Sequence, residues 1–223
     1  MYLCLTTRCD MLCPHCCNSA TAKGEDMSEE IFKKAVDICA ENGSGVMLGG
    51  GEPTIHPKFW QFLGYAIGKV SDNDAGIWMA TNGKVTSTAL ALAKMAKSGV
   101  IGVALSLDCW HEKIDPKVVE AFEHDRRRAD GFDRSDDRRE IRDVGHGYQG
   151  SIKNPIIAGR WKGPGGRTCP CEEIYVKPDG TVKQCGCRRS PVIGHVLTGY
   201  EPMSNDDGEN CCYRKLKKKA KVA

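Results

Sequence analysis

The stretch Cys9-Asp10-Met11-Leu12-Cys13-Pro14-His15-Cys16 places three cysteines in a Cys-x3-Cys-x2-Cys spacing, directly after an apolar segment at residues 2–7. Three thiolates on one short loop can hold three irons of a 4Fe-4S cluster. The fourth iron then has no protein ligand from this loop, and an open metal position is a place where a small molecule binds and reacts. A single Cys-x2-Cys pair would also fit zinc. The full triplet on a loop after a strand favours an iron–sulfur cluster.

Strand, loop and helix alternate along the first half of the chain. Ser28, followed by Glu29 and Glu30, is typical of a helix N-cap and an acidic first turn. The expected strands cover residues 2–7, 46–48, 76–80 and 100–107, and the expected helices cover residues 28–41, 57–70 and 86–98. Further candidates are a helix at 117–128 and strands at 142–148 and 154–158. This alternation predicts an α/β fold, in which parallel strands are joined by helical crossovers.

The unusual residues of this half all follow the predicted strands. They lie at residues 9–16, 49–52, 81–82 and 106–108. In parallel α/β folds the carboxyl ends of the strands meet at one edge, and the chemistry lies there. We therefore expect the four segments to form one site. The alternative for residues 49–53 and 81–83 is an ordinary turn.

The 13 cysteines dominate the composition of this 223-residue chain. The first residues lack a charged-then-apolar signal pattern, and no apolar run approaches the ~18 residues of a membrane span. We therefore expect a cytoplasmic protein with no membrane partner, whose cysteines serve metal or redox chemistry instead of disulfides. The net charge is +3, with six positive charges in residues 214–221. The rest of the chain has no general basic character, so residues 214–223 are expected to be a disordered tail, with a polyanion-binding arm as the alternative.

With these motifs in this order, the sequence resembles the radical S-adenosylmethionine (SAM) enzymes over residues 1–115. The resemblance rests on the cysteine triplet, Gly50-Gly51-Glu52-Pro53, Thr81-Asn82-Gly83 and Ser106-Leu107-Asp108. It implies a partial (β/α)6 TIM-like barrel over residues 1–160 and a 4Fe-4S cluster on Cys9, Cys13 and Cys16. SAM would chelate the open iron through its amino nitrogen and carboxylate oxygen. One electron, from a donor such as flavodoxin or ferredoxin, would then cleave SAM to a 5′-deoxyadenosyl radical that abstracts a hydrogen atom from a substrate.

The same resemblance implies a set of SAM-binding residues: His15, Gly50, Gly51, Glu52, Thr81, Asn82, Ser106 and Asp108. The glycines would let the backbone approach the methionine moiety. Glu52 would accept a hydrogen bond from the SAM ammonium group or orient its own loop, and Ser106 and Asp108 would hold ribose hydroxyls. The family usually has an aromatic residue at the position of His15, where an imidazole can still stack or hydrogen-bond. Cys109 is either a substrate-facing catalytic thiol or a packed structural one.

A second cysteine region follows a glycine-rich linker at residues 161–167. Pro178-Asp179-Gly180 predicts a hairpin turn whose open ends carry cysteines. The candidate metal ligands here are Cys169, Cys171, Cys185, Cys187, Cys211 and Cys212. The region, residues 161–213, resembles the auxiliary-cluster extension called SPASM or, in its short form, twitch, which implies a second 4Fe-4S cluster, with zinc as the alternative. Three further cysteines receive no ligand role: Cys4, Cys17 and Cys39.

The function expected from these features is that of a radical SAM enzyme that modifies or rearranges an unactivated C–H position. Its reaction subclass, whether oxidoreductase, isomerase or transferase, stays open. The auxiliary-cluster extension favours a peptide side chain as substrate, the short chain favours a nucleoside, and the basic tail favours a nucleic acid. Two alternatives are a zinc- or iron–sulfur-structured binding module without activity and a glycyl-radical activase.

Overall fold

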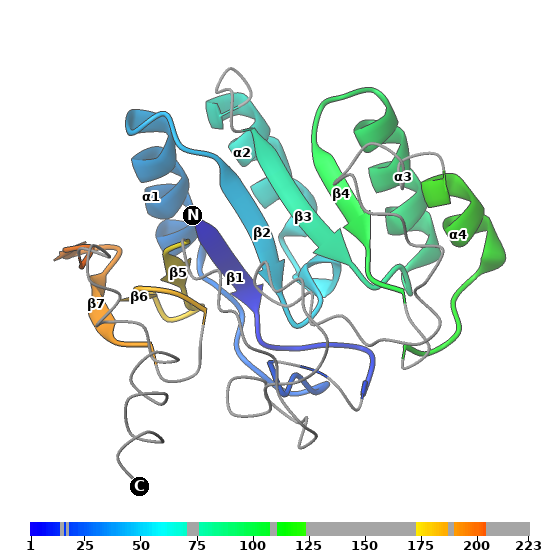
Figure 1. Cartoon of the computed structure of the whole chain (residues 1–223), viewed down its shortest axis with the longest axis horizontal. Coiled ribbons are helices and arrows are strands. Elements are labelled where there is room, and N and C mark those ends of the chain that lie inside the picture. The colour runs from blue at the N-terminus through cyan, green and yellow to red at the C-terminus, as the bar shows by residue number, and fades with distance from the viewer. Residues whose placement is uncertain are drawn as a thin grey trace, which may run out of the picture.

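The computed structural model describes residues 1–13, 16, 18–70, 76–107, 111–123, 173–186 and 190–203. Within these ranges eight strands form one mixed sheet in the order β4-β3-β2-β1-β5-β6-β7-β8. Figure 1 shows this sheet as an open row of strands that does not close into a barrel. The predicted α/β architecture is confirmed. No helix of the described ranges is long and apolar enough to cross a membrane.

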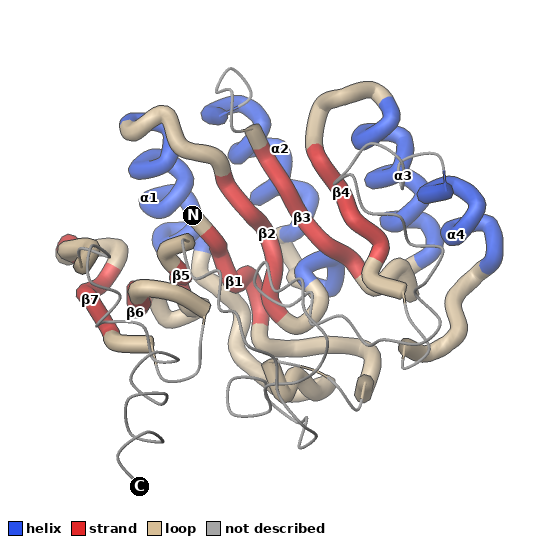
Figure 2. Tube along the Cα trace, viewed as in Figure 1, coloured by secondary structure: helices blue, strands red, loops and turns tan. Residues whose placement is uncertain are grey.

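Four parallel strands form one half of the sheet. They are β1 (Tyr2–Thr6), β2 (Val46–Gly50), β3 (Ile77–Thr81) and β4 (Gly102–Leu105). The helices that alternate with them are α1 (Glu29–Glu41), α2 (Phe59–Val70), α3 (Thr86–Lys97) and α4 (Pro116–Glu123), with a short 3-10 turn η1 (Pro53–Ile55) before α2. In Figure 2 the helices stand along one side of this row of strands, as consecutive right-handed crossovers require. The residues in which a (β/α)6 barrel would need further βα units, including the strand candidates at 142–148 and 154–158, lie outside the described ranges.

The hydrophobic core lies between the parallel strands and the helices. All five residues of β1, which lies between β2 and β5, are buried, and such continuous burial is typical of a strand whose two faces are both covered. Leu3 and Leu5 of β1 join a cluster with Phe32 of α1 and Phe62 of α2. The two phenylalanine rings stack with centroids 4.1 Å apart, which fixes α1 against α2.

Local hydrogen bonds set where the first two helices begin. The Ser28 side-chain oxygen accepts from the Ile31 N–H at 3.3 Å, as expected of an N-cap. Helix α2 begins at Phe59, two residues later than the sequence predicts. The cause is a turn in which the Lys58 N–H donates to His56 Nδ1 at 3.1 Å.

The C-terminal strands extend the sheet beyond β1. They are β5 (Tyr175–Val176), β6 (Thr181–Lys183), β7 (Val192–His195) and β8 (Gly199–Tyr200), and they form an antiparallel meander. The predicted hairpin turn between β5 and β6 is confirmed, with Gly180 at φ +83°. The sequence did not predict that β5 pairs with β1 in parallel, with Tyr2 opposite Tyr175 and their rings stacked 5.1 Å apart.

The stacked phenylalanines predict a contrast between two aromatic residues of α2. Replacing Phe62 with Ala removes a buried ring and leaves a cavity, so the free energy of unfolding should fall by about 3–5 kcal/mol. Replacing Trp60, which is 48% exposed, with Ala should lower it by less than about 1 kcal/mol. Urea unfolding of the metal-free protein, followed by circular dichroism, measures both. Equal losses would contradict the packing of α1 on α2.

Candidate active site

The loop after β2 runs against the start of the cysteine loop. The Gly51 N–H donates to the Thr6 carbonyl and the Glu52 N–H donates to the Arg8 carbonyl, each at 2.8 Å. A Cβ at Gly50 would lie 2.2 Å from the Thr6 carbonyl oxygen, and one at Gly51 would lie 2.1 Å from that of Arg8. From the sequence, these glycines were predicted to let the backbone approach a ligand closely. The structure shows that the contact between two loops of the chain already requires them.

Glu52 joins the loop after β2 to the end of β3. Its side chain is only 1% exposed. Oε1 accepts from the Thr54 N–H at 3.1 Å, the Thr54 hydroxyl at 2.6 Å and the Thr81 hydroxyl at 2.8 Å. Oε2 accepts from the Asn82 N–H at 2.7 Å. Burial raises the pKa of this carboxyl, and the hydrogen bonds oppose that rise. Of the two roles predicted for Glu52, this geometry favours the one in which it orients its loop.

Asn82 links the end of β3 to the cysteine loop. Its Nδ2 donates to the Asp10 carboxylate at 2.8 Å and lies 3.7 Å from the Cys9 sulfur. Its Oδ1 accepts from the Lys84 N–H at 2.9 Å. Residues 81–83 therefore run from the last residue of β3 into the loop that follows, and the Asn82 side chain reaches the predicted cluster ligand Cys9.

The three cysteines of the triplet, Cys9, Cys13 and Cys16, are half-buried, and the described cysteines form no disulfide. Backbone N–H groups approach two of the sulfurs, with Met11 N 3.4 Å from Cys9 Sγ and Ala20 N 3.4 Å from Cys16 Sγ. Hydrogen bonds to sulfur of this kind tune the ligands of iron–sulfur clusters. Two of the three triplet sulfurs therefore already lie close to backbone N–H groups.

The surroundings of Cys9 favour a bound cation. Burial, together with the charges of Glu52, Asp10 and Cys16, raises the pKa of the Cys9 thiol to about 11, although the hydrogen bond from the Met11 N–H acts in the opposite direction. A metal that replaces the proton would relieve this repulsion between negative groups. No three His, Cys, Asp or Glu side chains within the described ranges converge on one point as a single metal ion requires.

The end of β4 completes the rim as far as it is described. The Ser106 N–H donates to the Thr81 carbonyl at 2.8 Å, which places Ser106 beside the end of β3. The predicted convergence at the carboxyl ends of the four parallel strands is confirmed for the described segments. His15, Asp108 and Cys109 lie outside the described residues.

Cys185 is the only described candidate ligand of the second cysteine region, and it lies away from this rim. It follows β6, which runs antiparallel to β5 and pairs Lys183 with Tyr175. Because Tyr175 pairs with Tyr2, β6 ends at the edge of the sheet where β1 begins. Cys185 is 5% exposed, and its N–H donates to the Ser190 hydroxyl at 2.9 Å. The other candidates of this region lie outside the described residues: Cys169, Cys171, Cys187, Cys211 and Cys212.

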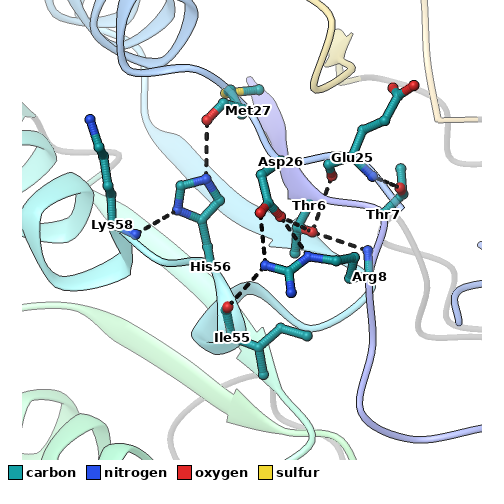
Figure 3. A network of polar contacts seen from close by, with 9 residues as sticks. All are labelled: Thr6, Thr7, Arg8, Glu25, Asp26, Met27, Ile55, His56 and Lys58. Carbon is teal, nitrogen blue, oxygen red and sulfur yellow. Dashed lines mark hydrogen bonds and ion pairs between the residues drawn. The ribbon is translucent and has the colours of Figure 1, made fainter. Parts of the chain in front are cut away.

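The base of the cysteine loop is held by an ion pair that no sequence pattern indicated (Figure 3). Arg8 donates to both carboxylate oxygens of Asp26, at 3.0 Å and 2.8 Å, and to the Ile55 carbonyl at 3.3 Å. The Thr6 hydroxyl donates to the same carboxylate at 2.6 Å. These hydrogen bonds hold the pKa of Asp26 below its ordinary value, although partial burial acts in the opposite direction.

Backbone hydrogen bonds extend this brace along both ends of the loop. The N–H groups of Thr7 and Cys9 donate to the carbonyls of Glu25 and Thr21, at 2.9 and 2.7 Å. We call residues 6–9 and 21–27 together the loop stem. His56 contacts the stem, with Nε2 lying 3.0 Å from the Met27 carbonyl. The stem fixes the direction in which Cys9 enters the loop.

Comparison with known proteins identifies relatives of this architecture. The family model described as the Radical SAM superfamily matches residues 3–138. The mycofactocin maturase MftC of Mycobacterium ulcerans is 33% identical over 108 residues, which is 47% of this chain and 27% of that protein. A tungsten-containing aldehyde ferredoxin oxidoreductase cofactor-modifying protein of Pyrococcus furiosus is 30% identical over 112 residues, 48% of this chain and 30% of that protein. The match thus spans less than a third of the length of these relatives.

Two solved structures share the fold. BtrN in complex with AdoMet and 2-DOIA aligns with a TM-score of 0.55 at 12% identity, over 97% of this chain and 84% of that one. The anSMEcpe structure with bound AdoMet and Cp18Cys peptide also aligns with a TM-score of 0.55, at 14% identity, over 89% of this chain and 77% of that one. At these identities the likeness concerns the fold.

The brace of the loop stem predicts a pH-dependent stability difference. Replacing Asp26 with Asn should lower the free energy of unfolding at pH 7 by about 1 kcal/mol, because the pair is charge-assisted yet partly exposed. The pKa of Asp26 is lower in the folded protein, so its contribution is present above the unfolded pKa and is lost as pH falls through about 4 and below.

Urea unfolding of the metal-free protein at several pH values measures this difference. The exposed Glu41, replaced with Gln, is the matched control and should cause no comparable loss. A loss for Asp26→Asn that stayed constant between pH 7 and pH 3.5 would rule out the ion pair as its source.

Proposed function

The chain belongs to the radical SAM superfamily, and from that premise we propose that it cleaves SAM reductively at a 4Fe-4S cluster held by Cys9, Cys13 and Cys16. When bound, the cluster supplies an open iron and an electron, and the 5′-deoxyadenosyl radical so released abstracts a hydrogen atom from the substrate. The observation that carries the proposal is the chain of contacts from Cys9 through Asn82 to Glu52. It joins three motif segments at one rim.

The residues of the rim have separate roles in this proposal. Each cysteine of the triplet holds one iron, and backbone N–H groups lie within hydrogen-bonding distance of two of the sulfurs. Glu52 orients the loop after β2, because its buried oxygens accept hydrogen bonds from the chain itself. Thr81 and Asn82 support the ligand from the end of β3, and Ser106 does so from the end of β4. The roles of His15 and Asp108 near adenosine, and of Cys109 near the substrate, rest on the sequence resemblance alone.

We further propose that the substrate is a peptide side chain. The relatives that match are named as a maturase and a cofactor-modifying protein, so both names describe the modification of another molecule. The resemblance of residues 161–213 to an auxiliary-cluster extension, which often accompanies peptide maturation in this superfamily, supports the same class. A flavodoxin or ferredoxin is the proposed electron donor.

An auxiliary 4Fe-4S cluster on the second cysteine region is the remaining part of the proposal. Cys185 is its described candidate ligand, and Gln184 beside it exchanges two hydrogen bonds with the Met203 backbone, at 3.2 and 2.9 Å. Met203, which precedes Cys211 and Cys212 in the sequence, therefore lies next to the end of β6. This supports a metal site at the edge of the sheet opposite the cysteine triplet, whether it holds a cluster or zinc.

The triplet assignment predicts which cysteines SAM cleavage requires. After anaerobic reconstitution with iron and sulfide, the wild-type protein should form 5′-deoxyadenosine from SAM and dithionite, and replacing Cys9, Cys13 or Cys16 with Ala should abolish it. Cys39, which is buried in α1, provides the matched control, since Cys39→Ala should retain the activity. A colourless wild-type protein that forms no 5′-deoxyadenosine would refute the proposed function.

Iron counting distinguishes a second cluster from zinc. With all three triplet cysteines replaced by Ala, the reconstituted protein should still bind about four irons if the second region holds a 4Fe-4S cluster. Elemental analysis of the same sample measures how many iron and zinc atoms are bound per protein. Almost no iron together with one bound zinc would exclude the auxiliary cluster and leave the first site untouched.

A further inference from the structure

Lys84 and Glu112 approach the exposed side of the cysteine loop from two other loops. Lys84 follows β3, and its Nζ donates to the Asp10 carbonyl at 2.5 Å and to Glu112 Oε2 at 2.6 Å. Glu112 precedes α4, and its Oε1 accepts from the Leu12 N–H at 3.3 Å. The pair thus binds one backbone acceptor and one backbone donor of the segment between Cys9 and Cys13.

We propose that Lys84 and Glu112 are positioning residues that act as a clasp on residues 10–12, so that the loop keeps its cluster. The inference rests on the proposed function, in which this loop holds the irons. The loop stem fixes the loop at its base, and Asn82 holds the Asp10 side chain. Met11 is buried at 3% exposure, whereas Leu12 is 64% exposed, and the clasp fixes the backbone on either side of Met11 through the Asp10 carbonyl and the Leu12 N–H.

Ordering the backbone of an exposed loop opposes its conformational entropy, at about 1–2 kcal/mol per residue. Charge-assisted hydrogen bonds to backbone groups, from an ammonium donor and a carboxylate acceptor, are among the stronger local means of offsetting that cost. Because both clasp contacts fall between the first two cysteines, they limit how far Cys13 moves relative to Cys9. A mobile ligand loop exposes the cluster to chelators and oxidants, so the clasp acts on cluster retention.

The two contacts are specific for the type of charge at each position. The ion pair itself is exposed, with side-chain exposures of 37% and 47%, and such pairs contribute only about 0–1 kcal/mol to stability. Exchanging the two residues, Lys84→Glu with Glu112→Lys, restores an ion pair between the same loops. However, a carboxylate at position 84 has no hydrogen to donate to the Asp10 carbonyl, and an ammonium at position 112 cannot accept from the Leu12 N–H. The exchange therefore distinguishes a clasp, which requires hydrogen bonds to the backbone of residues 10–12, from an ion pair that only joins the loops of positions 84 and 112.

The test measures iron release to a ferrous chelator under anaerobic conditions. Only iron bound at the triplet is counted. It is the difference between the iron of the tested protein and that of the variant with Cys9, Cys13 and Cys16 replaced by Ala, so an auxiliary site does not interfere. Lys84→Met and Glu112→Gln should each release this iron roughly ten- to a hundredfold faster than wild type, the range typical for loss of a supporting contact at a metal site. The exchanged double variant should release it equally fast.

Two controls keep the test specific. Lys177→Met breaks an ion pair of similar exposure, 45% and 47%, in the turn between β5 and β6, and should leave iron release unchanged. The melting temperature of the metal-free Lys84 and Glu112 variants should stay close to wild type, because an exposed pair contributes little to global stability. Electron paramagnetic resonance of the reduced cluster, with and without SAM, should broaden in both single variants.

The outcomes separate the clasp from the proposed function. Wild-type iron retention in Lys84→Met, or rescue by the exchanged double variant, would overturn the clasp while the SAM cleavage of the wild type stands. A wild-type protein that binds no iron and cleaves no SAM would overturn the proposed function, and the clasp with it.

Discussion

The carboxylate of Glu52 lies where the loops after β2 and β3 meet, out of contact with water. Burying such a group is unfavourable unless hydrogen bonds replace its hydration. Here the Thr54 N–H and hydroxyl, the Thr81 hydroxyl and the Asn82 N–H supply them. Because the donors come from two different loops, the carboxylate can be satisfied only when those loops have one relative arrangement.

The position of Asn82 follows from that arrangement. Its backbone N–H is held by Glu52, and its side chain then points to Asp10 and Cys9. The cysteine loop is thus positioned from two directions. The loop stem, with the Arg8–Asp26 pair, directs its base, and the end of β3 directs its first ligand.

The sequence predicted those parts of the fold and site that depend on local pattern. Apolar periodicity and the cap at Ser28 predicted the helices, and strand ends followed by unusual residues predicted one rim, because consecutive parallel strands end at the same edge. The contacts within the rim could not be predicted from the sequence. Arg8 and Asp26 pair across the cysteine loop, and no local sequence pattern encodes the path of that loop. The close approach of Gly51 to the Arg8 carbonyl depends on β1 and β2 being neighbours, which the local sequence does not reveal. Likewise, β5 has only two residues, too few for any periodicity to indicate β1 as its neighbour.

The pairing of β1 with β5 has a consequence for how the chain is made. One side of β1 stays an unpaired strand edge until Tyr175 and Val176 leave the ribosome. The interval between the end of α4 and that moment lasts roughly 3–10 s at typical synthesis rates. Through that time an apolar strand bearing backbone donors and acceptors is open to other chains. The nascent protein therefore passes through an aggregation-prone stage, which ends when β5 pairs with β1.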